Sequence, residues 1–500
     1  MNYKVVILLV CCFVLHQVQA HAQLLTLSVK SNSSVNTIAV NNTNWNTMQN
    51  GYNTTNNTIA FAQATLSGLL SGVLPKIGLK STLNSFTYTP PSDYSTLTNT
   101  VPANVVTAEI YAIPGSDGLS DQSDKILANS RPVAITNTDQ TMFSGVANLT
   151  LKLNLFSSDR PITIKYTISA DGMKQFLKAA GTYTLNLVYN SYNALGFSNG
   201  SAETTLTITV APFTMINSLS DLPRLKFTEA GHYVNGPKAV PAEQLITVTS
   251  TVPYNLKIKA GSSRFKDADG FTQNNMLVSH VSVQAGIQGG NVVTLNAIPT
   301  TETTLLSGSN ALQQVESVKY GIGTSFTSAY QKAGTYNSSL VFTASNKSGI
   351  ASNLFKDLYI DVDPIARLSV NGSVNLSFLT ADHYRNGIHS DVTDHLLIDK
   401  NSPFDIYVKA NGTYLEGNGA TIDLNNLLKI EPITTDATLS GSLRQIKLTT
   451  NYQPLIIGSD AGIGKKVSLR YSIDAIGSKR LINKPQGTYS TTITYSFTAQ

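Results

Sequence analysis

A long internal repeat constrains this chain of 500 residues more than any other feature. Three copies of Gly-Thr-Tyr are separated by the same interval, since 334 − 181 and 487 − 334 are both 153 residues. The copies are Gly181-Thr182-Tyr183, Gly334-Thr335-Tyr336 and Gly487-Thr488-Tyr489. A fixed period of this length indicates duplicated structural units rather than one large fold.

Other motifs keep the same order in each unit. A segment with a central tyrosine (Tyr166, Tyr320 or Tyr471) precedes each Gly-Thr-Tyr by 15, 14 or 16 residues. An opening motif runs through Phe227–Gly236 in the second unit and Phe378–Gly387 in the third. The first unit matches this motif weakly at Trp45–Tyr52, which leaves it about 27 residues longer than the others.

Proline marks the borders between units. The alternating runs Leu206–Val210 and Leu358–Val362 each lead into a proline, Pro212 or Pro364. Because proline cannot donate to a strand ladder, it suits the end of a strand. The predicted domains are a signal peptide at 1–22 and three modules at 23–211, 212–363 and 364–500.

Each module is predicted to be an antiparallel β-sandwich, so the fold class is all-β with three tandem modules. Tyr183, Leu185, Leu187 and Tyr189 share one face of an alternating segment, as half-buried strands require. Helix is expected only in short pieces, at 173–179 and 425–429.

The glycine and tyrosine of each Gly-Thr-Tyr predict a tyrosine corner, in which the hydroxyl turns back onto nearby backbone. The glycine would permit a tight approach. The alternative is a plain turn followed by an aromatic strand residue. The residues concerned are Gly181, Tyr183, Gly334, Tyr336, Gly487 and Tyr489.

The order of these motifs, with Ala-Gly-Thr-Tyr at 333–336 and an alternating Thr/Tyr strand at the C-terminus, resembles bacterial pilin-like domains of the spore coat protein U type. It is also similar to bacterial immunoglobulin-like surface repeats. The pilin-like resemblance implies chaperone–usher fibres and attachment to surfaces. It implies no catalytic residue.

The N-terminus predicts export. Lys4 precedes an apolar run at 5–15, and Ala20-His21-Ala22 offers a cleavage site before Gln23. Cys11 and Cys12 are the only cysteines, so the mature chain would hold no disulfide. Localisation is predicted to be extracellular or at the outer cell surface, with the periplasm as alternative. No integral membrane span is expected, because no second apolar run is long enough.

The third module is expected to lack its final strand. Only 13 residues follow Gly487, whereas 31 and 30 residues separate the earlier glycines from Pro212 and Pro364. An unpaired edge invites strand addition, either from another surface protein or from a second copy through Leu25–Val29. The alternative is a sandwich with one strand fewer, whose edge is short or covered.

Several groups of polar residues contain the side-chain types that bind metals or perform catalysis. His389-Ser390-Asp391-Val392-Thr393-Asp394-His395 is the densest set of metal-ligand types, and a solvated polar loop is its favoured interpretation. Turn chemistry is favoured for Asp117, Asp121 and Asp124 and for Asp267 and Asp269, over calcium binding. The matched His232 and His383 are expected to pack or cap. No catalytic residue, metal or cofactor is predicted.

The sequence therefore favours a non-enzymatic structural or adhesive surface protein. A carbohydrate-binding accessory protein is the first alternative, because Trp45, the only tryptophan, could stack on a sugar. A hydrolase on a β-scaffold is the second. A low charged fraction of 13% and a net charge of +5 exclude a strongly basic nucleic-acid-binding surface.

Overall fold

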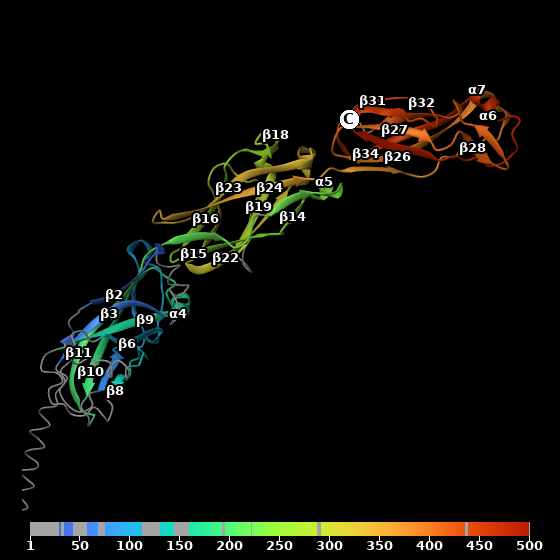
Figure 1. The fold of residues 1–500 in the computed structure, drawn as a ribbon. Coiled ribbons are helices and arrows are strands. Elements are labelled where there is room, and N and C mark those ends of the chain that lie inside the picture. The colour runs from blue at the N-terminus through green and yellow to red at the C-terminus, as the bar shows by residue number, and fades with distance from the viewer. Residues whose placement is uncertain are drawn as a thin grey trace, which may run out of the picture.

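The computed structural model describes residues 30–31, 35–43, 58–68, 76–112, 131–144, 160–192, 196–221, 223–287, 292–435 and 439–499. The described strands form sheets that follow one another along an elongated molecule (Figure 1). Two facing sheets enclose a core in each of three places, and we call these the first, second and third sandwich. Leu25–Val29, Trp45 and the three aspartates at 117, 121 and 124 lie outside the described residues.

The first sandwich contains a five-stranded sheet with order β1-β3-β9-β6-β7. Its strands are β1 (Lys30–Ser31), β3 (Thr58–Gly68), β9 (Arg160–Ser169), β6 (Val106–Ala112) and β7 (Val133–Ala134). The facing sheet has the order β2-β11-β10-β4-β8, with β5 also paired to β10. Its strands are β2 (Val35–Val40), β11 (Ser198–Val210), β10 (Gly181–Tyr192), β4 (Lys76–Ser81), β8 (Gln140–Ser144) and β5 (Thr87–Thr89).

The second sandwich repeats this plan. One sheet has the order β12-β15-β22-β19-β20, from β12 (Thr214–Ser218), β15 (Gln244–Ser250), β22 (Ala311–Ile322), β19 (Val281–Ile287) and β20 (Val292–Leu295). The other has the order β14-β13-β24-β23-β16-β21, and β17 and β18 join it through β23. Its strands are β14 (Lys238–Val240), β13 (Arg224–Phe227), β24 (Ala351–Val362), β23 (Gly334–Asn346), β16 (Tyr254–Ala260), β21 (Thr303–Gly308), β17 (Arg264–Asp267) and β18 (Thr272–Leu277).

The third sandwich has one sheet of order β25-β26-β34-β30-β32 and one of order β31-β33-β27-β35. The first is built from β25 (Ala366–Val370), β26 (Gly387–Lys400), β34 (Gly462–Asp474), β30 (Lys429–Thr435) and β32 (Ile446–Lys447). The second is built from β31 (Ser442–Leu443), β33 (Gln453–Ser459), β27 (Phe404–Ala410) and β35 (Ile493–Ala499), and β28 (Tyr414–Gly417) and β29 (Ala420–Asp423) form a separate hairpin.

The described helices are short. They are α4 (Ala170–Phe176), α5 (Gly231–Asn235), α6 (Ala381–Asn386), α7 (Ala475–Lys479), and the 3₁₀ turns η1 (Ser92–Tyr94), η2 (Ala103–Val105), η3 (Val278–His280) and η4 (Thr324–Tyr330). Helix α4 begins earlier than predicted, because the Ser169 hydroxyl caps the amide of Gly172 at 3.0 Å. The helix expected at 425–429 is wrong, since a turn there leads into β30.

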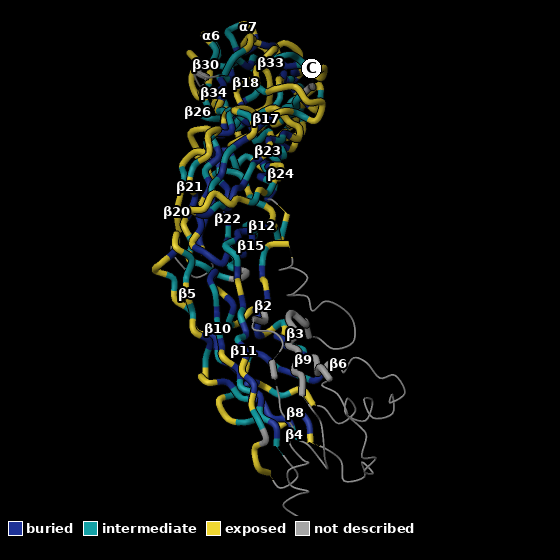
Figure 2. Tube along the Cα trace, turned by 90° about the vertical axis from the view of Figure 1, so that its left-hand side faces the viewer, coloured by how far each residue is buried: buried dark blue, intermediate teal, exposed yellow. Residues whose placement is uncertain are grey.

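Each sandwich encloses its own cluster of buried apolar residues, and a fourth, small cluster of Tyr94, Ala180 and Val252 joins the first two sandwiches. In Figure 2 the buried positions alternate with more exposed ones along strands such as β10 and β23, as the sequence pattern predicts. Mostly β structure in facing sheets confirms the all-β sandwich class. The domain borders at 211/212 and 363/364 stay a prediction.

Among the described residues, no helix is long and apolar enough to cross a membrane.

Candidate functional site

The first two sandwiches are closed by their last strand. In the second, β24 lies between β23, to which it is antiparallel, and β13, to which it is parallel. In the first, β11 lies in the same way between β10 and β2. The inward residues of both closing strands follow one pattern, Leu-x-Ile-x-Val, and all are at most 3% exposed. They are Leu206, Ile208, Val210, Leu358, Ile360 and Val362.

The corresponding position is open in the third sandwich. Strand β35 pairs with β27, and no other described strand pairs with its opposite edge. Residues 374–378 take the place of β13 in the sequence, because Leu376 and Phe378 match Leu225 and Phe227. They form no strand. Residues that correspond to both neighbours of the closing strand are therefore present, and none of the described strands corresponds to the closing strand itself.

Side-chain burial differs accordingly. Leu340 and Phe342 on β23 are fully buried, whereas their counterparts on β35, Ile493 and Tyr495, are only half-buried against the core. On the other wall, Leu225 and Phe227 are fully buried, and the matching Leu376 and Phe378 are half-buried. We call the half-buried set Val374, Leu376, Phe378, Ile493, Tyr495 and Phe497 the open groove.

Two tyrosines and a histidine support the open groove from inside. The Tyr471 and Tyr495 hydroxyls hydrogen-bond to each other, and burial raises the pKa of Tyr471 to about 12. The His395 ring packs edge-on against both rings, and its Nδ1 lies 2.6 Å from the Asn371 carbonyl. Burial lowers the pKa of this imidazole. His395 thus links β26 to the edge strand β35.

The set of residues from His389 to His395 is not the polar loop expected from the sequence. It lies within strand β26, which has a bulge between Val392 and Leu396. Asp391 receives two hydrogen bonds from Arg470, and Asp394 pairs with Lys466. The bulge turns His395 into the core. No group of three or more His, Cys, Asp or Glu in the described part of the chain is placed to hold a metal ion.

The three predicted corner tyrosines make the same contact. Each hydroxyl donates to the carbonyl four residues earlier: Tyr183 to Ala179 at 2.6 Å, Tyr336 to Lys332 at 2.8 Å and Tyr489 to Pro485 at 2.8 Å. Gly181 and Gly334 share φ of 151°. We propose that these contacts are tyrosine corners.

The backbone at Gly181 leaves no room for a side chain. A Cβ there would lie 2.5 Å from the Tyr88 ring and 2.6 Å from the Thr89 carbonyl oxygen. A fourth Gly-Thr-Tyr, at 412–414, falls outside the 153-residue period. Its Tyr414 is 47% exposed on β28, unlike the buried Tyr183 and Tyr336.

The matched histidines cap their segments, as expected. Nδ1 of His232 accepts the Thr228 amide, and Nδ1 of His383 accepts the Leu379 amide, both at 3.1 Å. Asp267 serves a turn, because its Oδ1 accepts the amides of Asp269 and Phe271.

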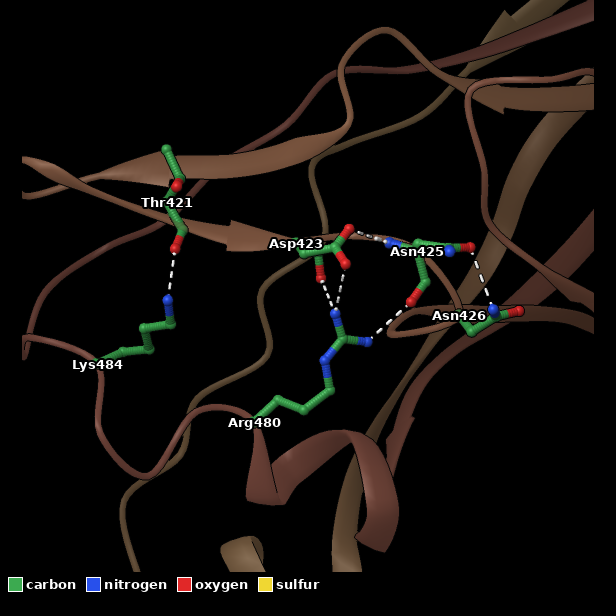
Figure 3. A network of polar contacts seen from close by, with 6 residues as sticks. All are labelled: Thr421, Asp423, Asn425, Asn426, Arg480 and Lys484. Atoms are coloured by element: carbon green, nitrogen blue, oxygen red, sulfur yellow. Dashed lines mark hydrogen bonds and ion pairs between the residues drawn. The ribbon is translucent and has the colours of Figure 1, made fainter.

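A polar cluster at the far end of the third sandwich is occupied by structural contacts (Figure 3). Arg480, just after α7, donates to the carbonyls of Asp423 and Asn425 and pairs with the Asp423 carboxylate. Lys484 donates to the Thr421 carbonyl at 2.8 Å. These bonds attach the segment between α7 and β35 to the β28–β29 hairpin and to the turn that follows it.

Four buried charged residues, Glu316, Asp399, Lys400 and Asp405, are not evident from the sequence, and Glu316 and Lys400 replace uncharged residues of other units. Glu316 is 0% exposed in the second core, where the other units have Ile162 and Val467. Lys400 is 8% exposed in the third sandwich, where the second has Ser250. An alignment of the three units would reveal both residues, because each of these positions is charged in one unit only.

No family model matches the chain, and no curated protein matches it by sequence. Solved structures that match the chain at a distance include a mutant of the CFA/I adhesin CfaE of enterotoxigenic Escherichia coli, at 9% identity and TM-score 0.24, covering 68% of this chain and 86% of that one. The CupB6 tip adhesin of Pseudomonas aeruginosa has 8% identity and TM-score 0.24, covering 68% and 99%. The extracellular cadherin domains 1–4 of protocadherin gamma B7 have 10% identity and TM-score 0.21, covering 90% and 76%.

Adhesin and cadherin chains are thus among the solved structures found. The likeness is distant, and the function proposed below rests on the sheets of this chain.

Proposed function

We propose that this protein is a non-enzymatic structural and adhesive component of the cell surface, exported from the cell, and that its third sandwich captures an extended strand from another polypeptide. The open groove is the observation that carries this proposal. Its two walls correspond to β13 and β23, and in the second sandwich the strand between them buries three apolar side chains.

The energetic reason is twofold. An unpaired edge exposes backbone donors and acceptors that a partner strand would satisfy. The half-buried apolar side chains of the open groove would also lose solvent contact, at a gain of about 25 cal/mol per Å² of apolar surface. A strand would therefore be held both by a ladder and by alternating side chains.

The chain itself provides the probe. A fluorescent peptide with the sequence of β24, residues 351–362, carries the closing strand of the second sandwich. It should bind the purified chain in a fluorescence anisotropy titration and slow amide exchange along β35. A peptide with Leu358, Ile360 and Val362 all changed to Ser should not bind.

A groove-filled variant supplies the matched control. In it, a copy of residues 347–362 is joined after Gln500, so that the added strand can fold back onto β35 as β24 does onto β23. This variant should unfold at a higher temperature and bind no peptide. If the β24 peptide did not bind the unmodified chain, strand capture would be refuted.

Surface location is tested separately. Electron microscopy of whole cells with a gold-labelled antibody should show the protein on the outer surface. Label confined to the periplasm after sectioning would contradict the proposed location and leave the peptide result unaffected.

A further inference from the structure

The end of the open groove nearest the second sandwich contains a mostly buried cation. Lys400 is the last residue of β26, and its Nζ lies 5.3 Å from the centre of the Phe497 ring on β35. Among the described residues no carboxylate pairs with this ammonium. The neighbouring acids Asp399 and Asp405 accept hydrogen bonds from the amides of Gly464 and Gly458.

At the position of Lys400 the second sandwich has an uncharged residue, Ser250, whose hydroxyl is hydrogen-bonded within the sandwich. Ser250 takes the register position of Lys400, since Thr214 pairs with Ser250 as Ala366 pairs with Lys400. The Ser250 and Thr214 hydroxyls lie 2.9 Å apart, and Asn346 donates to Thr214. The third unit has alanine at both flanking positions, 366 and 499, so neither residue there can accept a bond from Lys400 through its side chain.

The closing strand reaches this same place. Ser352 of β24 lies opposite Ala344, and its hydroxyl accepts the amide of Ile216 on β12 at 3.4 Å. Ala344 corresponds to Phe497 at the 153-residue interval. A strand captured in the register of β24 would therefore set one side chain opposite Phe497, beside the Lys400 ammonium.

We propose that the open groove selects a strand from a different polypeptide that carries an aspartate or glutamate opposite Phe497, six residues before the first residue of a Leu-x-Ile-x-Val-like run. The inference rests on the proposed function and names its partner. Burying the ammonium under a strand without an acceptor would cost free energy, whereas a carboxylate supplies a charge-assisted bond in a place shielded from water.

A second copy of this chain does not meet that requirement through Leu25–Val29. In the same register the position facing Phe497 would be Gln19, which lies in the predicted signal peptide, and residues 1–29 contain no aspartate or glutamate. Leu27-Ser28-Val29 also matches Leu368-Ser369-Val370 of β25, the first strand of the third sandwich. This sequence match is a second reason not to choose Leu25–Val29 as the captured strand.

The experiment is a double-mutant cycle with the β24 peptide. One peptide carries Ser352→Glu and the other Ser352→Gln, which has the same shape and no charge. Each is titrated into the unmodified chain and into Lys400→Met. The Glu peptide should bind the unmodified chain about tenfold more tightly than the Gln peptide, and this ratio should fall to about one for Lys400→Met.

Salt gives a readout that needs no variant. The preference of the unmodified chain for the Glu peptide should persist between about 0.05 and about 0.5 M NaCl, because a pair covered by the captured strand is screened much less than an exposed pair. The Gln peptide should bind the Lys400→Met variant and the unmodified chain with similar affinity. That result would show that the open groove is intact in the variant.

The outcomes separate the two proposals. Equal binding of both peptides to the unmodified chain, at low and high salt, would overturn the choice of an acidic partner and leave strand capture standing. Binding of neither peptide would refute strand capture itself. A copy of residues 23–40 that binds as tightly as the Glu peptide would identify a second copy of the chain as the occupant instead.

Discussion

Arg224 holds Asp361 through two hydrogen bonds, from Nε to Oδ2 and from Nη2 to Oδ1, each 2.6 Å long. The pair joins β13 to β24, two parallel strands that are far apart in sequence. It therefore fastens the closing strand of the second sandwich to its outer neighbour, at the position that is open in the third.

Replacing Asp361 by Asn should weaken this attachment. The expected loss is about 1 kcal/mol in the free energy of unfolding, because the pair is bidentate but partly exposed. The hydrogen bonds from Arg224 hold the pKa of Asp361 below its ordinary value. The stability they supply is thus present above the unfolded-state pKa of about 4 and is lost as pH falls through the folded-state pKa.

Urea unfolding between neutral pH and about pH 3 checks this prediction. Asp357→Asn is the matched control, since Asp357 is an exposed carboxylate on the same strand. Equal losses for the two variants would contradict the role given to the Arg224 pair.

Replacing the tyrosines of the Gly-Thr-Tyr triplets by phenylalanine should lower the free energy of unfolding by amounts that depend on their burial. Tyr336→Phe removes a hydrogen bond from a side chain that is 1% exposed and should cost about 1 kcal/mol. Tyr489→Phe should cost less, because Tyr489 lies nearer the surface. Tyr414→Phe, at the Gly-Thr-Tyr outside the period, should change nothing. Thermal unfolding of the three variants decides whether the shared contact is structural.

Glu316 should make the second sandwich more stable in mild acid. Its Oε1 accepts a bond from Tyr254 at 2.7 Å, while its buried Oε2 has no partner in the described structure. Burial raises the pKa of this carboxyl. Its contribution is therefore complete below the unfolded-state pKa of about 4.3 and is lost as pH rises through the folded-state pKa.

The variant Glu316→Gln should remove this dependence and stabilise the protein by about 1 kcal/mol at neutral pH. Denaturation at several pH values from about 4 to about 8 measures the difference. A variant that is less stable than the parent at neutral pH would show that the ionised carboxylate has a partner.

His395 predicts the opposite trend in the third sandwich. Because burial lowers the pKa of its imidazole, its contribution is present above the unfolded-state pKa of about 6.5 and declines as pH falls through the folded-state pKa. His395→Gln should flatten the loss of stability between about pH 7 and about pH 5. His389→Gln, at an exposed position on the same strand, should leave the slope unchanged.

The sequence predicts the features that all three units share better than the features that occur in one unit only. Alternation along Gly181–Tyr192 predicts β10 because every second residue enters the core. The open position beside β35 follows from comparing the units. The strand at His389–His395 is not evident, because the bulge and paired charges of β26 interrupt its alternation.

The chemistry of the groove could be predicted only in part. The apolar residues of β35 stand at alternate positions, so their shared face is visible in the sequence. The burial of Lys400 is not visible in the sequence, because lysine is usually exposed and because this burial depends on where β26 ends relative to Phe497.

The seams between sandwiches also determine how tension would travel along the molecule. Strand β11 ends at Val210 and β12 begins at Thr214, and β24 ends at Val362 with β25 beginning at Ala366. A pull on both ends would load the parallel β13–β24 pair in shear, so its ladder and the Arg224–Asp361 pair would resist together rather than one bond at a time. The third sandwich has no such clamp among its described strands. On the proposal made here, a captured strand would itself become that clamp, and the protein would bear load at this end only while it holds its partner.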